Sequence, residues 1–179
     1  MEIRDGWLAS VRQVASPHFD ARPAGQVNAI VIHCMSLPAG HFGGPWIEAL
    51  FRGDLVVGDY GGGLHPDFAD LTGLRVSAHV VIRRDGEAIQ FVGFEDRAWH
   101  AGTSSYMGRE AWNDFAIGIE LEGTDTTPFT AAQYRVLSEV VGACRLHYGI
   151  ASDWIVGHSD IAPGRKADPG IGFDWSRLR

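Results

Sequence analysis

Three short runs of apolar residues constrain the fold of this chain more than any other feature. They read NAIVIHCM, SAHVVIR and FAIGIELE, over Asn28–Met35, Ser77–Arg83 and Phe115–Glu122. β-branched residues are frequent in them, and each run is shorter than an ordinary helix, so we predict buried strands. Buried strands need apolar neighbours, and the expected fold is therefore a mixed central β-sheet flanked by helices.

Turn and helix signals fill the intervals between these strands. The Asp-Gly pair at 85–86 supplies positive φ and predicts a hairpin that returns over Ala88–Val92. A short helix over Pro45–Phe51 and a last strand over Ser152–Val156 complete the order, which is typical of an α/β protein. The chain has 179 residues, and we expect a single domain over 1–179.

One longer helix is predicted near the carboxyl end. Thr130 and Gln133 have the spacing of a capping box, and Gly149 suits a carboxyl-terminal cap. Between them, four residues share one face at helical spacing: Leu137, Val141, Cys144 and Tyr148. This face predicts the packing of the helix on the sheet.

Composition excludes several classes of function. The net charge is −7 and no run of Lys or Arg occurs, which argues against a nucleic-acid partner because neutralising phosphates needs a basic face. Two cysteines, Cys34 and Cys144, do not make a disulfide framework. No apolar run approaches the ~18 residues of a membrane helix, and the first residues lack the apolar core of a secretory signal. We therefore expect a cytoplasmic protein that does not span a membrane.

Metal-ligating residue types occur at the ends of two predicted strands. His33 ends AIVIH, and His158 follows WIVG. Asp168 lies ten residues beyond His158 on a loop rich in Pro and Gly that can fold back. Two imidazoles and one carboxylate suit zinc and leave one position for water. Spacing alone is equally compatible with His33 bonded inside the core and His158 in a turn.

Acidic and basic side chains accompany these candidates. Glu120 and Glu122 alternate with apolar residues in GIELEG, so both point to the same face of their strand. Either one can act as a general base, or both can be ordinary exposed glutamates. Lys166 can stabilise an oxyanion, although its position is also compatible with a solvated lysine.

The segment AWHAG contains Trp99 and His100 and is unlike ordinary surface sequence. It can form a platform for a sugar or peptide, or a core tryptophan with a hydrogen-bonded histidine. Cys34 follows His33 directly and points to the opposite face of the strand, so we expect a core cysteine. A cysteine hydrolase that uses Cys34 is the alternative.

Six segments taken together resemble the zinc-dependent N-acetylmuramoyl-L-alanine amidases. They are VIHCMSLPAG, GGPWIEALF, LRVSAHVVIRRDGEAIQFV, RAWHAGTSSYMGRE, NDFAIGIELEGTD and GHSDIAPGRKADPG. The similarity covers nearly the whole chain in order, and is greatest to the AmpD type, which cleaves 1,6-anhydro-muramoyl peptides in the cytoplasm. The fold it implies is shared with peptidoglycan-recognition proteins and phage amidases.

The resemblance also implies roles for individual residues and a muropeptide as the small-molecule partner. One zinc ion per chain is held by His33, His158 and Asp168. Glu120 is the catalytic base, and Lys166 stabilises the transition state. We further expect Arg75 to bind a peptide carboxylate, because a guanidinium matches a carboxylate, and His79, Trp99 and His100 to line the sugar side.

Three positions depart from the family pattern. Ala78 stands where some phage relatives have a tyrosine, so Glu120 has to serve as the base. Cys34 stands where an asparagine is expected, which removes a possible hydrogen bond to substrate. The loop Val56–Leu64 is longer than the AmpD type predicts. A non-catalytic muropeptide-binding module of the same fold is the remaining alternative, and the oligomeric state is left open.

Overall fold

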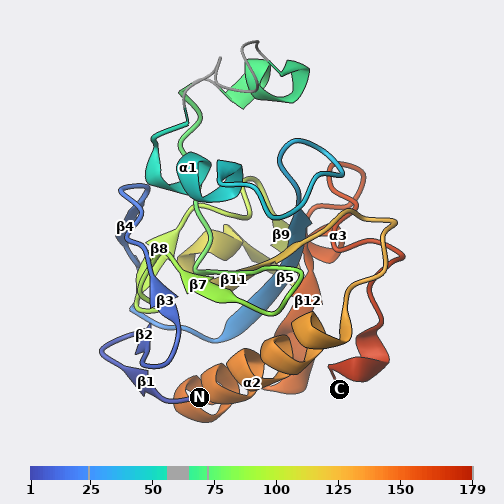
Figure 1. Cartoon of the computed structure of the whole chain (residues 1–179). Helices are drawn as coiled ribbons and strands as arrows, with labels where there is room; N and C mark the ends of the chain where they lie inside the picture. The colour runs from blue at the N-terminus through green and yellow to red at the C-terminus, as the bar shows by residue number, and fades with distance from the viewer. Residues whose placement is uncertain (24, 56–64, 72, 179) are drawn as a thin grey trace.

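A six-stranded mixed sheet forms the centre of the computed structural model (Figure 1), which describes residues 1–23, 25–55, 65–71 and 73–178. The strand order is β12 (Ile155–Gly157), β5 (Ala29–Met35), β11 (Ala116–Glu122), β6 (Val80–Ile82), β7 (Ala88–Gln90) and β3 (Arg12–Gln13). The first four strands are parallel, β7 runs antiparallel to β6, and β3 is parallel to β7. The predicted mixed sheet is confirmed.

Smaller elements surround this sheet. Two short antiparallel pairs lie outside this sheet. One joins β1 (Ile3–Arg4) to β2 (Trp7–Leu8), and the other joins β4 (Phe19–Ala21) to β8 (Asp96–Ala98). A third pair joins β9 (Ser105–Tyr106) to β10 (Arg109–Glu110). Single 3₁₀ turns cover Pro66–Leu71, Trp112–Asp114, Ser152–Trp154 and Trp175–Arg177. The predicted long loop Val56–Leu64 lies outside the described residues.

The longest strand pair, β5 with β11, is in register over its whole length. Ala116 pairs with Ala29 at one end and Glu122 with Met35 at the other, so Glu120 lies directly beside His33. Ile30 and Ile32 belong to the core beneath α2. Because side chains alternate along a strand, His33 and Glu120 project from the opposite face.

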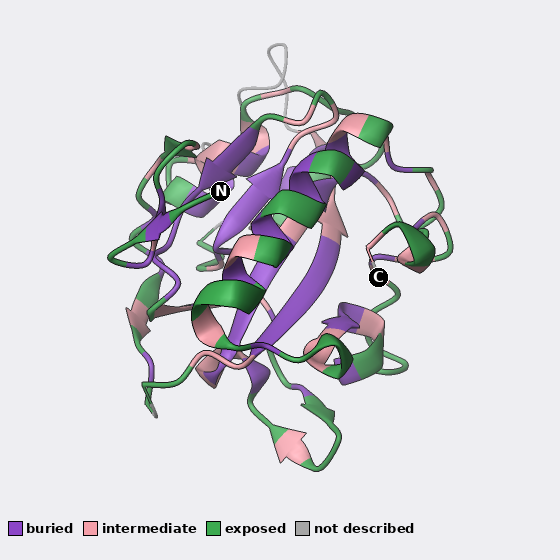
Figure 2. Cartoon of the chain, turned by 90° about the horizontal axis from the view of Figure 1, so that it is seen from below, coloured by how far each residue is buried: buried purple, intermediate pink, exposed green. Residues whose placement is uncertain are grey.

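Helix α2 (Ala131–Tyr148) covers one face of the sheet, with its buried side toward the strands and its exposed side toward solvent (Figure 2). Both halves of the predicted capping box are present, since Gln133 N donates to Thr130 Oγ1 and Thr130 N donates to Gln133 Oε1. Gly149 ends the helix at φ 71°, a conformation that favours glycine. The predicted bounds are therefore confirmed.

Helix α1 (Trp46–Arg52) lies on the other side of the sheet (Figure 1). Its buried residues share a cluster with side chains of β6 and β7, among them Ile47, Leu50, Phe51, Val81 and Ile89. The two helices leave uncovered the carboxyl ends of β5 and β12, where polar residues follow the apolar runs. No helix in the described part of the chain is long and apolar enough to cross a membrane.

Three predicted strands are shorter in the structure. The hairpin arm predicted over Ala88–Val92 is a strand at Ala88–Gln90. The run Ser77–Arg83 is a strand only at Val80–Ile82, and Ser77 pairs instead with Trp99, through its main-chain N–H and its hydroxyl, and donates from Oγ to His18 O. The run Ser152–Val156 begins with a 3₁₀ turn, and the strand occupies Ile155–Gly157. The one-turn helix α3 (His158–Ile161) then follows directly where a loop was expected.

Leu137 gives a test of the α2 packing. Its side chain is fully buried against the sheet, and truncation to alanine should lower the free energy of unfolding by about 2–5 kcal/mol. Leu146 on the same helix is 89% exposed, so Leu146→Ala is the matched control and should change little. Chemical denaturation measures both. Equal effects of the two substitutions would contradict this arrangement of α2.

Candidate metal centre and catalytic residues

Three metal-ligating side chains converge at the carboxyl ends of β5 and β12. His33 lies near the end of β5, His158 begins α3 immediately after β12, and Asp168 returns from the following loop. His33 Nδ1 lies 2.9 Å from His158 Nδ1 and 3.2 Å from Asp168 Oδ2, and His158 Nδ1 lies 3.0 Å from the same oxygen. The three residues form a group able to hold one metal ion.

The loop that carries Asp168 is folded back onto α3 by main-chain contacts. Ser159 N donates to Asp168 O at 2.9 Å. Gly170 adopts φ 76°, and a β-carbon at this position would lie 2.1 Å from Asp125 O, so only glycine fits. A β-carbon on Gly157 would lie 2.9 Å from the Cδ atom of Pro169. The loop rich in Pro and Gly therefore folds back, as the sequence predicted, and brings Asp168 to the two histidines.

The protonation of the group suits a divalent cation. Burial lowers the pKa of His33 to about 4, so its ring is neutral at pH 7. Burial raises the pKa of Asp168, but the adjacent rings of His158 and His33 outweigh it and hold the pKa below its usual value. His158 Nε2 lies 3.1 Å from Ala101 O, an atom that only accepts, so this nitrogen donates and Nδ1 is left on the side of Asp168. Two ring nitrogens and one carboxylate oxygen then face a common point.

Glu120 stands beside this point with one oxygen unpaired. Its Oε2 is buried and has no hydrogen-bond partner among the described residues. Burial raises the pKa of Glu120 well above its usual value, and the charge of Asp168 adds to the rise. The side chain of Lys166 is exposed, yet its charge lowers the pKa of both His33 and Glu120, which places it within electrostatic reach of the group.

The second glutamate of GIELEG has a different environment. Glu122 is only 2% exposed. Its Oε1 accepts from Gly43 N at 2.6 Å and from Arg83 Nη1 at 3.2 Å, and its Oε2 accepts from Arg84 N at 3.2 Å. Glu122 therefore ties the loop before α1 to the hairpin turn. The sequence predicted a common face for the two glutamates but did not distinguish their environments.

Cys34 faces away from His33, toward the core beneath α2. Its Sγ lies 3.8 Å from Pro169 O. Burial raises the pKa of this thiol, and the charge of Glu120 raises it further. A thiol that stays protonated at neutral pH is a poor nucleophile, which argues against the cysteine hydrolase.

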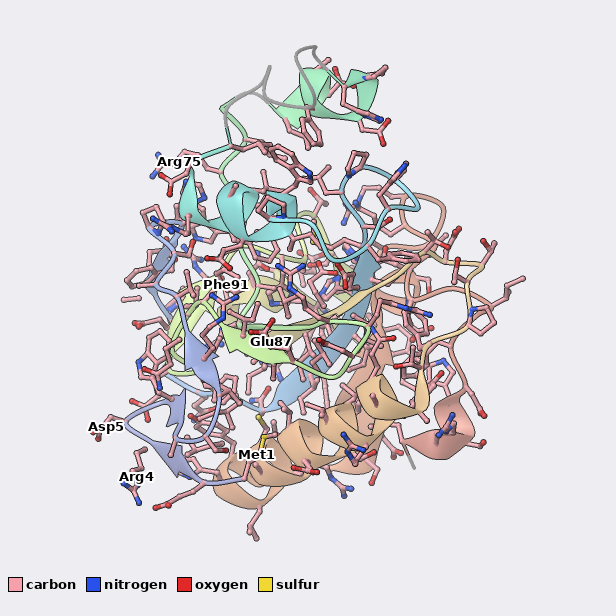
Figure 3. All side chains as sticks on the ribbon, in the orientation of Figure 1. Met1, Arg4, Asp5, Arg75, Glu87 and Phe91 are labelled. Carbon is pink, nitrogen blue, oxygen red and sulfur yellow. The ribbon has the colours of Figure 1, made fainter. Side chains whose placement is uncertain are left out.

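Trp99 and Arg75 lie together at the surface beside α1. The Arg75 guanidinium carbon is 5.3 Å from the centroid of the Trp99 ring, and Trp99 Nε1 donates to Asp20 Oδ1 at 3.2 Å. Figure 3 shows Arg75 at the outer side of the molecule near α1. A carboxylate can reach this guanidinium, so the role predicted for Arg75 stays open to test.

His79 and His100 lie deeper than the sequence suggested. His79 is fully buried, its Nδ1 accepts from Gly118 N at 3.0 Å, and its Nε2 lies 3.1 Å from Asp96 O. A direct sugar contact would require this environment to open. His100 Nδ1 is 2.9 Å from His33 Nε2. Burial lowers the pKa of both rings well below the usual value, so both are neutral.

Two polar residues that the sequence did not single out support this region. Asn113 Oδ1 accepts from His100 N at 3.0 Å and from Ala101 N at 2.8 Å. The buried guanidinium of Arg22 donates to Asn113 O and Ala116 O. No local sequence signal marks either residue, because their partners are far away along the chain.

Comparison with known proteins places this geometry in a family. Residues 23–171 match the family described as N-acetylmuramoyl-L-alanine amidase. The chain belongs to this family. The resemblance carried by the six segments is confirmed, and the protein is an amidase enzyme of the expected fold.

Three individual proteins show how close the similarity is. The 1,6-anhydro-N-acetylmuramyl-L-alanine amidase AmpD of Citrobacter freundii is 53% identical over 100% of this chain and 94% of its own length. The crystal structure of a Se-Met AmpD derivative has a TM-score of 0.94 at 53% identity, covering 100% of this chain and 98% of that one. The amidase AmiD from E. coli, in complex with anhydro-N-acetylmuramic acid-L-Ala-D-gamma-Glu-L-Lys, has a TM-score of 0.60 at 28% identity, with 99% and 63% covered.

Glu120→Gln tests the environment of this carboxyl in the metal-free protein. Because folding raises the pKa of Glu120, the folded protein loses stability as the pH rises from the usual pKa towards the raised one, since the unfolded chain ionises while the buried carboxyl stays protonated. The glutamine variant has no such loss and should melt higher than wild type at neutral pH in chelator. The difference should disappear near the usual carboxyl pKa. Glu139→Gln, at an exposed position on α2, is the control. A glutamine variant less stable at neutral pH would contradict the burial.

Proposed function

We propose that the chain is a zinc amidase that cleaves the bond between the lactyl group of 1,6-anhydro-N-acetylmuramic acid and L-alanine in muropeptides. Residues 1–179 form its single catalytic domain. Its place is peptidoglycan recycling in the cytoplasm, which cell fractionation tests. The identity to the AmpD relatives, over nearly the whole of both chains, supports the choice of the anhydro sugar.

The observation that carries this proposal is the convergence of His33, His158 and Asp168 next to the unpaired oxygen of Glu120. Two imidazoles and one carboxylate are a donor set of catalytic zinc sites, which keep a further position open. When bound there, zinc supplies Lewis acidity, which activates water and polarises the amide carbonyl. His33 and His158 bring rigid, buried ligands, because His33 lies in β5 and His158 directly follows β12.

Glu120 moves the proton in this mechanism. Its Oε2 takes a proton from the attacking water, whose oxygen bonds to the amide carbon. The electron pair of the C–N bond then leaves with nitrogen as this bond breaks, and Glu120 returns the proton to the amine of L-alanine. The raised pKa of Glu120 suits the first transfer, because a carboxylate with an ordinary pKa is a weak base toward water. The products are a sugar acid and a free peptide.

Lys166 stabilises the charge that develops on the carbonyl oxygen. Its side chain is exposed, and its charge lowers the pKa of both Glu120 and His33. A cation here contributes more as negative charge grows on the oxygen than it does to the neutral amide. Lys166 therefore acts on the transition state rather than on substrate binding.

The substrate contacts are the least constrained part of the proposal. Arg75 presents an exposed guanidinium for a peptide carboxylate, and Trp99 offers a ring face beside it. We keep the assignment of His79 and His100 to the sugar side of the site, where they lie behind the surface and a direct sugar contact would require their buried rings to become accessible. The AmiD complex with an anhydro-muramyl peptide supports a muropeptide as the ligand.

Two other functions are less well supported. A non-catalytic binding module would not need three metal-ligating groups and an unpaired carboxyl at one point, yet all four are present here. A cysteine hydrolase would need a reactive thiolate, whereas the thiol of Cys34 is turned toward the core and its pKa is raised.

Metal removal and product analysis together test the requirement for zinc and the identity of the cleaved amide bond. Treatment with a strong chelator should abolish amide cleavage of an anhydro-muramoyl tripeptide, and one equivalent of zinc per chain should restore it, because the attack needs an activated water. Mass spectrometry identifies the sugar acid and the peptide, and a muramoyl peptide without the anhydro ring measures the sugar preference. Activity that survives chelation would exclude the metal mechanism.

Substitutions separate the roles of the side chains. Glu120→Gln should bind zinc normally and lose most turnover, and Lys166→Ala should lower kcat by about 10²-fold or more with little change in KM. Cys34→Ser is the matched control, since it is next to His33 but should be nearly silent. Steady-state kinetics with zinc content measured per chain gives all three results. An inactive Cys34→Ser variant would favour the cysteine hydrolase instead.

A further inference from the structure

Each metal-facing imidazole has a second ring nitrogen that points away from the metal site, and both of these nitrogens meet the same short segment. His158 Nε2 lies 3.1 Å from Ala101 O. His33 Nε2 lies 2.9 Å from His100 Nδ1. Consecutive residues of AWHAG therefore contact both candidate ligands from behind. This segment belongs to neither of the strands that carry the histidines.

The hydrogen-bond partners fix where the protons are. A carbonyl oxygen only accepts, so His158 Nε2 carries the proton donated to Ala101 O. His100 Nε2 lies 3.4 Å from Ala116 O and carries a proton for the same reason. A ring that donates from Nε2 can accept at Nδ1, and the 2.9 Å separation lets His100 Nδ1 accept from His33 Nε2. A cation held between the two Nδ1 atoms and Asp168 would take the Nδ1 lone pairs and leave the protons of both ligand rings on Nε2.

The segment is held in place on two sides. Asn113 Oδ1 accepts from the main-chain N–H groups of His100 and Ala101, at 3.0 and 2.8 Å. The ring of His100 lies against the backbone of β11 at Gly118, where a β-carbon would come within 2.4 Å of the His100 Cγ atom. The ring can occupy this position only because residue 118 has no side chain. His100 therefore has little freedom to turn away from His33.

We propose that His100 is a positioning residue: its Nδ1 accepts from His33 Nε2 and so presents His33 Nδ1 to the metal, while Ala101 O does the same for His158. The inference rests on the metal role proposed for His33 and His158. An imidazole replaces the carboxylate or carbonyl that usually accepts from a ligating histidine. Such partners orient the ring and increase its basicity, so the metal affinity depends on them.

Two substitutions separate acceptance of the hydrogen bond from mere packing. His100→Asn keeps an acceptor, since the Asn Oδ1 is the same number of bonds from the main chain as His Nδ1. His100→Leu fills similar space and accepts nothing. Zinc affinity, measured by competition with a chromogenic chelator, should fall about 10–100-fold in the leucine variant and stay within about threefold of wild type in the asparagine variant. His147→Asn, at an exposed position on α2, is the control and should not change it.

The proton positions are measured directly in the zinc-loaded protein. Long-range ¹H–¹⁵N NMR of the ring nitrogens should find the proton of His33 on Nε2 in wild type and in His100→Asn. The leucine variant should show a mixture of both forms, because its His33 has lost the acceptor. A wild-type His33 with its proton on Nδ1 would overturn the proposal, even if the leucine variant does not fold.

The remaining outcomes separate this inference from the proposed function. A wild-type chain that binds no zinc contradicts the proposed function itself. A wild-type chain that binds zinc, with a leucine variant that binds it equally well, overturns the role of His100 alone. If that variant also has a raised KM for muropeptide, His100 contacts the sugar and does not position the ligand.

Discussion

The parallel pairing of β5 with β11 is the constraint on which the candidate site depends. Seven consecutive residue pairs align the two strands, so His33 and Glu120 lie side by side on one face of the sheet. A shift of one residue in either strand would turn one of these side chains toward α2. The relation between the candidate base and the first candidate ligand is therefore set by the main chain of the sheet and by the apolar layers on its two faces, before any loop contributes.

The sequence predicted much of this frame, because its signals are local. Apolar runs, a capping box and glycine at a helix end depend on neighbouring residues, and they located β5, β11 and α2 to within a residue or two. The limits appear where segments distant along the chain supply the hydrogen-bond partners. Ser77 bonds to His18 and Trp99, and the strand predicted from Ser77 begins only at Val80. Period-two alternation likewise put Glu120 and Glu122 on one face, but only the fold shows that both carboxylate oxygens of Glu122 accept hydrogen bonds.

The candidate site was predictable to a similar degree. Strand ends suggested His33 and His158, and the Pro and Gly residues around Asp168 suggested a turn, but spacing left each open to an ordinary structural role. Only the order of six segments, read as a family resemblance, joined them. The supporting residues could not be predicted, since Asn113 hydrogen-bonds to main-chain atoms and His100 contacts the ring of His33. Such roles leave no pattern along the sequence.

The wide separation of the candidate ligands has a consequence for synthesis of the protein. His33 and Asp168 are 135 residues apart, so a metal ion that joins them closes most of the chain into one loop. Closing so long a loop restricts the unfolded chain strongly. A nascent chain that has emerged as far as β11 already has five of the six strands, the first candidate ligand and the candidate base, but neither His158 nor Asp168. The candidate metal group can therefore assemble only after the segment that contains His158 and Asp168 has been made, and a chain cut after β11 would have five strands without this group.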